Sequence, residues 1–355
     1  MEDMLDPKTI RLSALRQTAV VIPCHNEENT ILKVVESLPK GLGQYLVIDN
    51  GSSASCRQYL KANLTGEHLL SVEKPLGVGG AFLAGCERLK GDIHWICKLD
   101  GDDQFADVAL DSFLTQAAIN HTSLVKTARC NRLGWGIEKQ RSLSRHWGNQ
   151  LVTLALGIAS GYYLLEDGTS GLFVIERSAL EAAKNRGDLR HDHGFEKSLL
   201  INLGCLGASM LELRIAIRYD SNRRRTFKGR ALIKPLLALI CGGLKERLLG
   251  EHLIYRLSPG GILLLISSGF FGAGAALTAL ATFKALSMGV PTTPGISAAA
   301  TGLMSLGLLT GVGFFIYDFS ATFRRYRNAT NFDCWQPIAT QGIQATRNHQ
   351  AKRPS

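Results

Sequence analysis

The sequence predicts an α/β domain followed by an α-helical membrane domain. Over residues 1–228, short apolar segments alternate with segments of helical periodicity, which is typical of a parallel sheet covered by helices on both faces. A polar or glycine-rich turn follows most of these apolar segments, so the turns are expected at one edge of the sheet. Two charge-free apolar runs, 257–283 and 295–317, are then each long enough to cross a bilayer.

Four strands are expected before residue 100. Each is a short apolar run, and the first and the third are each followed by a helix. Asn29 or Thr30 can cap a helix over 31–38, and a glycine-rich loop opens another over about 82–89. The expected strands cover 18–23, 45–48, 69–72 and 93–97.

The rest of this region continues the pattern. A fifth strand is expected at 124–129, followed by a basic connection and a helix that ends near Leu156. Residues 211–217 alternate between apolar and other side chains, which predicts a strand at the edge of the sheet.

The composition excludes a disordered or a disulfide-stabilised chain. The 355 residues carry a formal net charge of +10, and 20% of them are charged. The eight cysteines include no C-x-x-C pair, which predicts reduced thiols in a cytoplasmic domain. The first twenty residues lack an apolar core, so no signal peptide is expected. Basic residues cluster beside the apolar runs, which favours anionic lipids or phosphorylated substrates over nucleic acid.

An acidic segment, Asp100-Gly101-Asp102-Asp103-Gln104, follows the fourth expected strand. Asp100, Asp102 and Gln104 alternate along the chain and would point the same way in an extended segment. Hard oxygen ligands at this spacing suit Mg²⁺ or Mn²⁺, which often bridge to the phosphates of a substrate. A surface turn rich in aspartate and glycine is the alternative interpretation.

Four segments in this order have a pattern in common with a known family. They read VVIPCHNE at 20–27, VIDNGSS at 47–53, LGVGGA at 76–81 and DGDDQ at 100–104. Together they resemble the family-2 glycosyltransferases, and the last resembles the metal motif of the dolichol-phosphate mannose synthase branch. The resemblance implies a GT-A fold, a Rossmann-like domain that binds a nucleotide sugar.

The resemblance also implies roles for individual residues on the donor side. His25 replaces the usual aromatic residue, and Asn50 replaces the second aspartate of the usual pair, so Asp49 is favoured to read the base. For the glycines, a plain strand-to-helix turn is the alternative. The implied nucleotide-sugar-binding residues are Pro23, His25, Glu27, Asp49, Gly77, Gly79 and Asp100, and the implied ligands of Mg²⁺ or Mn²⁺ are Asp100, Asp102 and Gln104.

On the acceptor side, the segment 167–173 resembles the family's D-x-T-S-G-F segment, although Val174 stands where many relatives have an arginine. One cation must therefore come from elsewhere. The basic loop 218–228 can bind phosphate groups. The alternative interpretation of this loop is a solvated patch or a patch that contacts lipid headgroups. The implied catalytic residues are Asp100, Asp102, Arg129, Arg141 and Ser170, and the implied acceptor-phosphate residues are Arg141, Ser170, Arg223, Arg225 and Lys228.

A histidine-containing segment, 191–196, resembles the start of a helix in the same family. His191 and His193 are two residues apart and have no further ligand spacing, so polar contacts at the helix start are favoured over a zinc site.

The expected organisation has four parts: a GT-A domain at 1–228, interfacial amphipathic helices at 229–256, two transmembrane helices at 257–321 and a cytoplasmic tail at 322–355. The interfacial segment is expected to break near Pro235 and Gly242-Gly243. Lysine and arginine precede the first span and follow the second, with only Lys284 between them, so both ends are expected in the cytoplasm.

The function that the resemblance implies is inverting transfer of one sugar from a nucleoside diphosphate sugar to a polyprenyl or dolichyl phosphate at the membrane. The attacking phosphate oxygen is largely ionised near neutral pH, so no strong general base is needed. The alternatives are another lipid acceptor, such as diacylglycerol or ceramide, and a non-catalytic membrane subunit that binds a nucleotide sugar. The sequence does not decide whether the chain forms a homo-oligomer.

Overall fold

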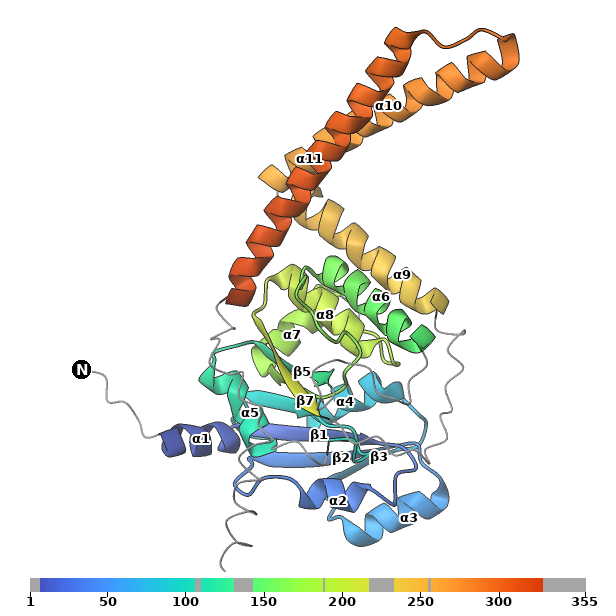
Figure 1. The fold of residues 1–355 in the computed structure, drawn as a ribbon. Helices are drawn as coiled ribbons and strands as arrows, with labels where there is room; N and C mark the ends of the chain where they lie inside the picture. Colours follow the sequence, from blue (N-terminus) through green and yellow to red (C-terminus); the bar gives the residue numbers. More distant parts are fainter. Residues whose placement is uncertain are drawn as a thin grey trace, which may run out of the picture. The chain divides into compact units, whose positions relative to one another are not determined.

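The computed structural model describes residues 7–105, 110–130, 143–187, 189–216, 233–254 and 257–327 (Figure 1). The chain divides into two compact units. The first comprises Met1–Ile240 with Arg325–Ser355, and the second comprises Cys241–Arg324.

In the described part of the first unit, seven strands form one sheet in the order β3-β2-β1-β4-β6-β5-β7. β1 pairs in parallel with β2 and β4, whereas β6 is antiparallel to both of its neighbours. The sheet is therefore mixed, and the prediction of a wholly parallel sheet was wrong. The strands are β1 (Thr18–Cys24), β2 (Gln44–Asn50), β3 (Leu69–Val72), β4 (Trp95–Lys98), β5 (Leu124–Cys130), β6 (Phe173–Glu176) and β7 (Met210–Ala216).

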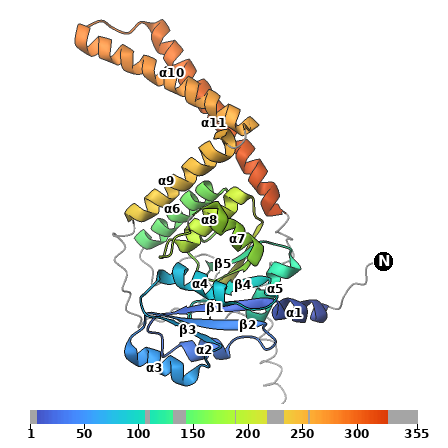
Figure 2. The same ribbon diagram turned by 180° about the vertical axis from the view of Figure 1, so that it is seen from behind.

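Helices cover both faces of this sheet, and successive residues of β1 serve the two faces in turn. Val20 and Ile22 belong to a buried cluster with residues of α2, α3 and α5. Val21 lies beside Gly85 of α4 on the other face. Figure 2 shows α2 and α3 on one side of the sheet and α4 and α8 on the other. The helices described in this unit begin with α1 (Pro7–Arg16), α2 (Ile31–Glu36), α3 (Ala54–Asn63), α4 (Gly77–Arg88) and α5 (Leu110–Ile119), and continue with α6 (Leu143–Ser160), α7 (Arg177–Arg186) and α8 (Phe195–Leu206).

The carboxyl ends of β2, β1 and β4 lie side by side, because these three strands are parallel neighbours. The polar turns that follow them therefore gather at one edge, as the alternating pattern predicted. This edge carries the candidate site described below.

The helix α9 (Ile233–Lys245) crosses from the first unit into the second. It continues through Pro235 and Gly242-Gly243, so the predicted breaks were wrong. Pro235 lies in the first helical turn, where the N–H that proline lacks has no partner within the helix.

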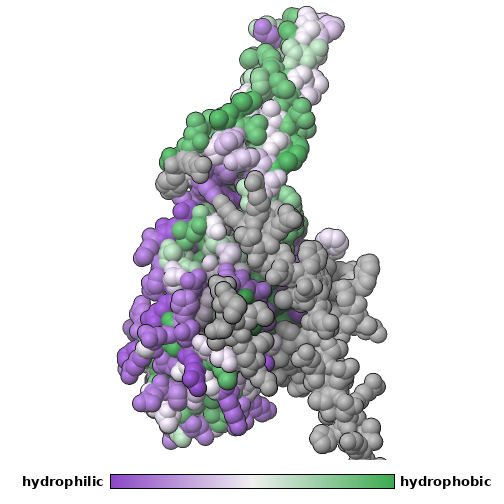
Figure 3. Space-filling view, turned by 90° about the vertical axis from the view of Figure 1, so that its left-hand side faces the viewer, coloured by the Kyte–Doolittle hydropathy of each residue, from purple (hydrophilic) through white to green (hydrophobic). Residues whose placement is uncertain are grey.

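The second unit contains a π-helical segment, η2 (Glu246–Ile254), and two long helices, α10 (Pro259–Met288) and α11 (Pro294–Arg327). Within these helices, Pro259–Met288 and Pro294–Thr322 are long and apolar enough to cross a membrane. Few of their residues are buried, and Figure 3 shows their largely hydrophobic surface.

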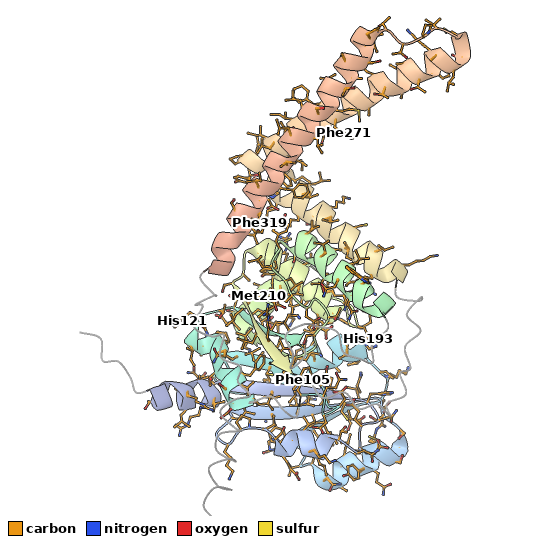
Figure 4. The ribbon with its side chains drawn as sticks, in the orientation of Figure 1. Phe105, His121, His193, Met210, Phe271 and Phe319 are labelled. Carbon is orange, nitrogen blue, oxygen red and sulfur yellow. The ribbon has the colours of Figure 1, made fainter. Side chains whose placement is uncertain are left out.

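Small residues bring α10 and α11 together. A Cβ atom on Gly307 would lie 2.6 Å from the backbone nitrogen of Phe271, which Figure 4 labels. A Cβ atom on Gly274 would likewise lie close to Met304, as expected for a small residue between membrane helices. A Cβ atom on Gly272 would have no such neighbour within 4 Å.

A buried polar cluster joins η2 to α10 and α11. Arg247 donates to both carboxylate oxygens of Asp318 at 2.7 Å, and His252 lies 3.3 Å from the same carboxylate. Ser258 caps α10 by accepting the Gly261 N–H and lies 2.8 Å from the other ring nitrogen of His252. Charged groups at the end of an apolar helix are thereby paired rather than left alone.

Candidate active site

A cavity of about 480 Å³ lies in the first unit at the carboxyl edge of the sheet. The turns after β1, β2 and β4 form one side of it. The turn before β6, the segment 190–197 and two leucines of α9, Leu236 and Leu239, complete the lining. Phe105 and His193, labelled in Figure 4, are two of the lining residues.

The structure brings six of the predicted site residues into this lining: Pro23, His25, Glu27, Asp100, Asp102 and Gln104. They come from segments up to about 80 residues apart, and the parallel pairing of β1 with β4 joins them. Arg141, Arg223, Arg225 and Lys228 lie outside the described residues, and for Arg129 only the backbone, in β5, is described.

The loops after β1 and β2 hold each other in place. The Asn26 N–H donates to Ser52 Oγ at 3.1 Å, and Asn26 Oδ1 accepts the Ser53 N–H at 2.7 Å. His25 Nδ1 lies 3.0 Å from the Asn50 carbonyl oxygen. Asn26 adopts a left-handed conformation with φ of 56°, which asparagine tolerates better than most residues. These bonds fix an imidazole ring at the cavity wall.

Asp49 has partners within its own turn. Its side chain is fully buried, and it accepts hydrogen bonds from the Ser52 N–H at 3.0 Å and from Arg57 Nε at 3.2 Å. The next residue, Asn50, lines the cavity, and its Oδ1 accepts the Leu76 N–H at 2.7 Å. Reading of the base by Asp49 stays a prediction.

Gly77 and Gly79 have structural roles that do not require a nucleotide. A Cβ atom on Gly77, whose φ is +77°, would lie 2.3 Å from the His191 carbonyl oxygen. A Cβ atom on Gly79 would lie 2.5 Å from Phe195, and the Gly79 N–H donates to His191 at 2.9 Å. The glycines thus let the start of α4 approach the segment before α8. Only Val78 of this loop lines the cavity, and nucleotide binding by the two glycines stays a prediction.

The acidic segment folds into a tight turn after β4. The backbone N–H of Gln104 donates to Asp102 Oδ1 at 3.3 Å, and its side-chain amide also donates to Asp102. Asp103 has a left-handed φ of 61°. Asp100 and Asp102 both line the cavity, so two carboxylates face the same space.

The donor set fits a divalent cation that a substrate would help to bind. Within the described ranges, no group of three His, Cys, Asp or Glu side chains is arranged to hold a metal ion. Mg²⁺, however, is usually bound through one or two carboxylates, with water and substrate phosphates as the other ligands. The described lining also carries an excess of negative charge, from Glu27, Asp100, Asp102, Asp192 and Glu196 against Lys98, Arg190 and Lys197.

A buried lysine lies beneath the acidic segment. The side chain of Lys98, at the end of β4, is 1% exposed, and its Nζ lies 2.6 Å from Asp100 Oδ1 and 3.1 Å from Glu196 Oε1. Burial alone would lower the pKa of Lys98, but the two carboxylates outweigh it and raise the pKa above the ordinary value. Lys98 is therefore charged, and it joins the acidic segment to the start of α8.

Ser170 lies in the interior of the domain. It is fully buried, and its hydroxyl lies against the Thr127 hydroxyl. Its neighbours Thr169 and Gly171 line the cavity, and Thr169 Oγ1 donates to Asp167 Oδ1 at 2.8 Å. The catalytic and acceptor-phosphate roles of Ser170 stay predictions.

The segment 190–197, which ends in the first turn of α8, contributes two cations that the sequence did not place in the site. Arg190 binds Asp192 through two nitrogen atoms at 2.9 and 2.6 Å, and both residues line the cavity. The hydrogen bond from Arg190 is the main reason that the pKa of Asp192 falls to about 2. Lys197 also lines the cavity and donates to the His193 carbonyl oxygen at 3.0 Å. Arg190 and Lys197 thus place two positive charges in the lining beside the negative charges of Asp192 and Glu196.

Some of these additions had a signal in the sequence. Lys98 is a charged residue inside an apolar strand, and a buried lysine requires an ionic partner. Asp192 lies in the segment 191–196 that resembles the family, whereas Arg190 and Lys197 had no signal, because they reach the cavity through the packing of α8 against α4 and the sheet.

One family model and two curated proteins match parts of the chain. Residues 19–183 match the model described as Glycosyl transferase family 2. An uncharacterised protein of Methanocaldococcus jannaschii is 25% identical over 208 residues, which cover 56% of this chain and 87% of that protein. The undecaprenyl-phosphate 4-deoxy-4-formamido-L-arabinose transferase of Proteus mirabilis is 26% identical over 159 residues, which cover 42% of this chain and 47% of that protein.

Among solved structures, two complexes of the glucosyl-3-phosphoglycerate synthase of Mycobacterium tuberculosis are similar. The complex with uridine diphosphate has a TM-score of 0.48 at 20% identity and covers 69% of this chain and 86% of that one. The complex with Mn²⁺, uridine diphosphate and glucosyl-3-phosphoglycerate has a TM-score of 0.47 at 20% identity and covers 73% of this chain and 88% of that one.

Proposed function

Residues 19–183 form a glycosyl transferase family 2 domain of the GT-A type, and we propose that the chain uses it to transfer one sugar from a nucleoside diphosphate sugar to a polyprenyl phosphate. The main support is a single cavity that has two carboxylates on one wall and cations on another, at the carboxyl edge of the sheet. The acceptor class is supported by the Proteus mirabilis relative, whose name specifies undecaprenyl phosphate, and by the two apolar helices.

The donor would lie along the turns after β1 and β2. The His25 ring can stack on a base, and the Asn50 side chain lies beside it at the cavity wall. Asp100 and Asp102 would hold Mg²⁺ or Mn²⁺, which when bound neutralises charge on the leaving diphosphate. Gln104, through its hydrogen bonds, would hold Asp102 in place.

The acceptor phosphate would lie toward the segment 190–197. Arg190 and Lys197 offer the positive charge that Val174 does not, and Thr169 offers a hydroxyl. A phosphate monoester has a second pKa of about 6, so its oxygen is already a nucleophile near neutral pH. Asp192, with a pKa of about 2, would be a poor general base there. Asp192 would therefore not serve a hydroxyl acceptor, whereas an ionised phosphate needs no base.

The transfer would proceed as one in-line displacement. An acceptor phosphate oxygen forms the bond to the anomeric carbon, while the bond from that carbon to the diphosphate oxygen breaks. The nucleoside diphosphate leaves with the electron pair, and the anomeric configuration is inverted. Because attacking and leaving oxygens are both ionised, the chemistry depends on placing charges rather than on moving a proton.

The experiment that tests this proposal uses the full chain in detergent or liposomes with Mn²⁺ or Mg²⁺. A short-chain polyprenyl phosphate and a panel of radiolabelled UDP- and GDP-sugars are supplied, and labelled lipid is measured. We expect one donor to give labelled lipid with the wild type, and Asp102→Ala to lower the rate at least about 100-fold because it removes a charge at the diphosphate. Nucleotide binding without transfer from any donor would contradict the proposal and favour a non-catalytic subunit.

A further inference from the structure

The ammonium group of Lys98 connects three walls of the cavity. It donates to Asp100 Oδ1 at 2.6 Å, lies 3.1 Å from Glu196 Oε1, and donates to the Gly171 carbonyl oxygen at 3.3 Å. Asp100 belongs to the turn after β4, Gly171 to the turn before β6, and Glu196 to the first turn of α8. A lysine ammonium has three N–H donors, so these three partners account for all of them.

The two carboxylates of this cluster are less buried than the lysine. The Lys98 side chain is 1% exposed, whereas those of Asp100 and Glu196 are 35% and 12% exposed. Each carboxylate is therefore held from behind by the ammonium group and faces the cavity in front. A buried ammonium group is tolerated only when it is paired with opposite charge. Removal of one member of the cluster would therefore leave a buried charge without its partner.

The packing around Asp100 leaves it little freedom. A Cβ atom on Gly171 would lie 2.5 Å from Asp100 Oδ2 and 3.3 Å from Lys98 Nζ. Lys98 thus binds one oxygen of the Asp100 carboxylate, and the glycine backbone lies close to the other. A carboxylate held in this way keeps one orientation, which is the requirement for a group that must meet a diphosphate or its cation at a fixed place.

We propose that Lys98 is a positioning residue for the sugar transfer proposed above, on which this inference rests. It holds the Asp100 carboxylate toward the donor, and through Glu196 and Gly171 it fixes that carboxylate relative to the acceptor side of the cavity. With a side chain only 1% exposed, Lys98 acts through Asp100 and Glu196 rather than as a reacting group. Its charge also limits the attraction of the acidic wall for a divalent cation, so that the geometry of the site, rather than a surplus of negative charge, determines where the cation is bound.

Lys98→Met tests this inference because methionine keeps much of the volume and removes the charge. We expect kcat to fall about 100-fold, as for a reacting group displaced by about 1 Å. We also expect Mn²⁺ to bind roughly threefold more tightly or better in the presence of UDP or GDP, because a positive charge near the cation is lost. Affinity and rate should therefore change in opposite directions.

Two further variants separate positioning from a purely structural role. Lys98→Met combined with Glu196→Gln removes the surplus carboxylate charge, and we expect it to recover about tenfold in kcat and to return the Mn²⁺ affinity toward the wild-type value. Lys184→Met makes the same substitution at a lysine of α7 that lies outside the cavity lining, and serves as the matched control. The thermal midpoint of each purified full-length variant is measured without metal.

The inference is overturned if Lys98→Met keeps its kcat within threefold of the wild type. It is equally overturned if the variant loses Mn²⁺ affinity and thermal stability together and the double variant restores neither, since Lys98 would then only hold the fold. Mn²⁺ affinity, measured by electron paramagnetic resonance with the nucleotide diphosphate, requires no transfer. If the wild type transfers no sugar, this readout therefore still tests Lys98 while the proposed function fails separately.

Discussion

At the residue scale, Glu212 in β7 shows how a buried carboxyl group supports the cavity from outside it. Its Oε2 accepts the Glu166 N–H at 2.7 Å and its Oε1 accepts the Asp167 N–H at 3.3 Å, which fixes the turn that leads to Thr169. Lys126 lies 3.8 Å from Oε1. Burial nevertheless raises the pKa of Glu212 to about 7.

This raised pKa predicts a pH dependence of stability. In the unfolded chain the carboxyl group loses its proton near pH 4.3, so between there and pH 7 the folded chain binds more protons than the unfolded one. The contribution of Glu212 to the free energy of unfolding is therefore full below about pH 4 and is lost as the pH rises through 7. It amounts to roughly 3.5 kcal/mol at most.

Glu212→Gln removes the titration and keeps one of the two acceptor oxygens, so one of the two N–H groups retains its hydrogen bond. We expect the thermal midpoint of the variant, relative to the wild type, to rise by several degrees between pH 5 and pH 8. Thermal scans of both proteins in the same detergent at closely spaced pH values measure this difference. A difference that stays constant over the whole range would show that Glu212 does not titrate in the folded protein.

The limits of sequence-based reasoning are clearest at this scale. The motifs selected Asp49 and Ser170, whereas in the structure their neighbours Asn50 and Thr169 line the cavity. In a strand, alternate residues point to opposite faces, but this rule stops where the strand ends and a turn begins. Asp49 and Ser170 are used in local hydrogen bonds that only the folded turn reveals.

At the scale of elements, the packing of α4 against the segment before α8 places Arg190 and Asp192 at the cavity. Gly79 permits this approach, since a Cβ atom there would lie 2.5 Å from Phe195 and 2.7 Å from the Arg190 carbonyl oxygen. The apolar contacts of Phe195 with Phe82 and Phe173 join the two helices to β6. The glycine-rich loop therefore shapes the part of the cavity wall that carries Arg190 and Asp192.

Gly79→Ala tests which role of this loop is the larger. If packing is decisive, the variant loses about 1–3 kcal/mol of stability in the absence of any nucleotide, because the extra methyl group overpacks the helix contact. Chemical or thermal unfolding of the nucleotide-free protein measures this loss. Gly148→Ala, at an open position of α6, is the control and should be neutral or stabilising. Unchanged stability with weakened nucleotide binding would instead assign Gly79 to the donor site.

The sequence predicted the elements better than their pairing. The apolar runs located β1 to β5 and β7, because buried strands require such runs. The antiparallel direction of β6 had no local signal, since strand direction depends on how the whole connection through α6 returns to the sheet. The segment of α9 was predicted to break at Pro235 and Gly242-Gly243, but the helix is continuous. Tertiary context can override such helix breakers.

At the scale of the whole molecule, the two long apolar helices predict attachment to a membrane with both chain ends in the cytoplasm. The described spans are Pro259–Met288 and Pro294–Thr322, and the segment between them carries little positive charge. Such an arrangement would keep the family 2 domain at the cytoplasmic surface, where nucleotide sugars are available.

A pair of single-cysteine additions tests this topology. Thr292→Cys lies between the spans and Ser355→Cys at the end of the chain. We expect a membrane-impermeant maleimide to label Thr292→Cys in intact cells, well above the parent chain, and to label Ser355→Cys only after lysis. Labelling of Ser355→Cys in intact cells would contradict the predicted orientation, and extraction of the chain by alkaline carbonate would contradict membrane insertion.

The central claim is that the acceptor is an ionised phosphate on a polyprenyl chain. The most direct measurement compares a polyprenyl phosphate with the polyprenol of the same chain length, each supplied to the full-length protein with the donor that the sugar panel identifies. We predict labelled lipid from the phosphate and at least about 100-fold less from the alcohol, because the alcohol would need a general base. Comparable transfer to the alcohol, or to diacylglycerol but not to the phosphate, would contradict the account.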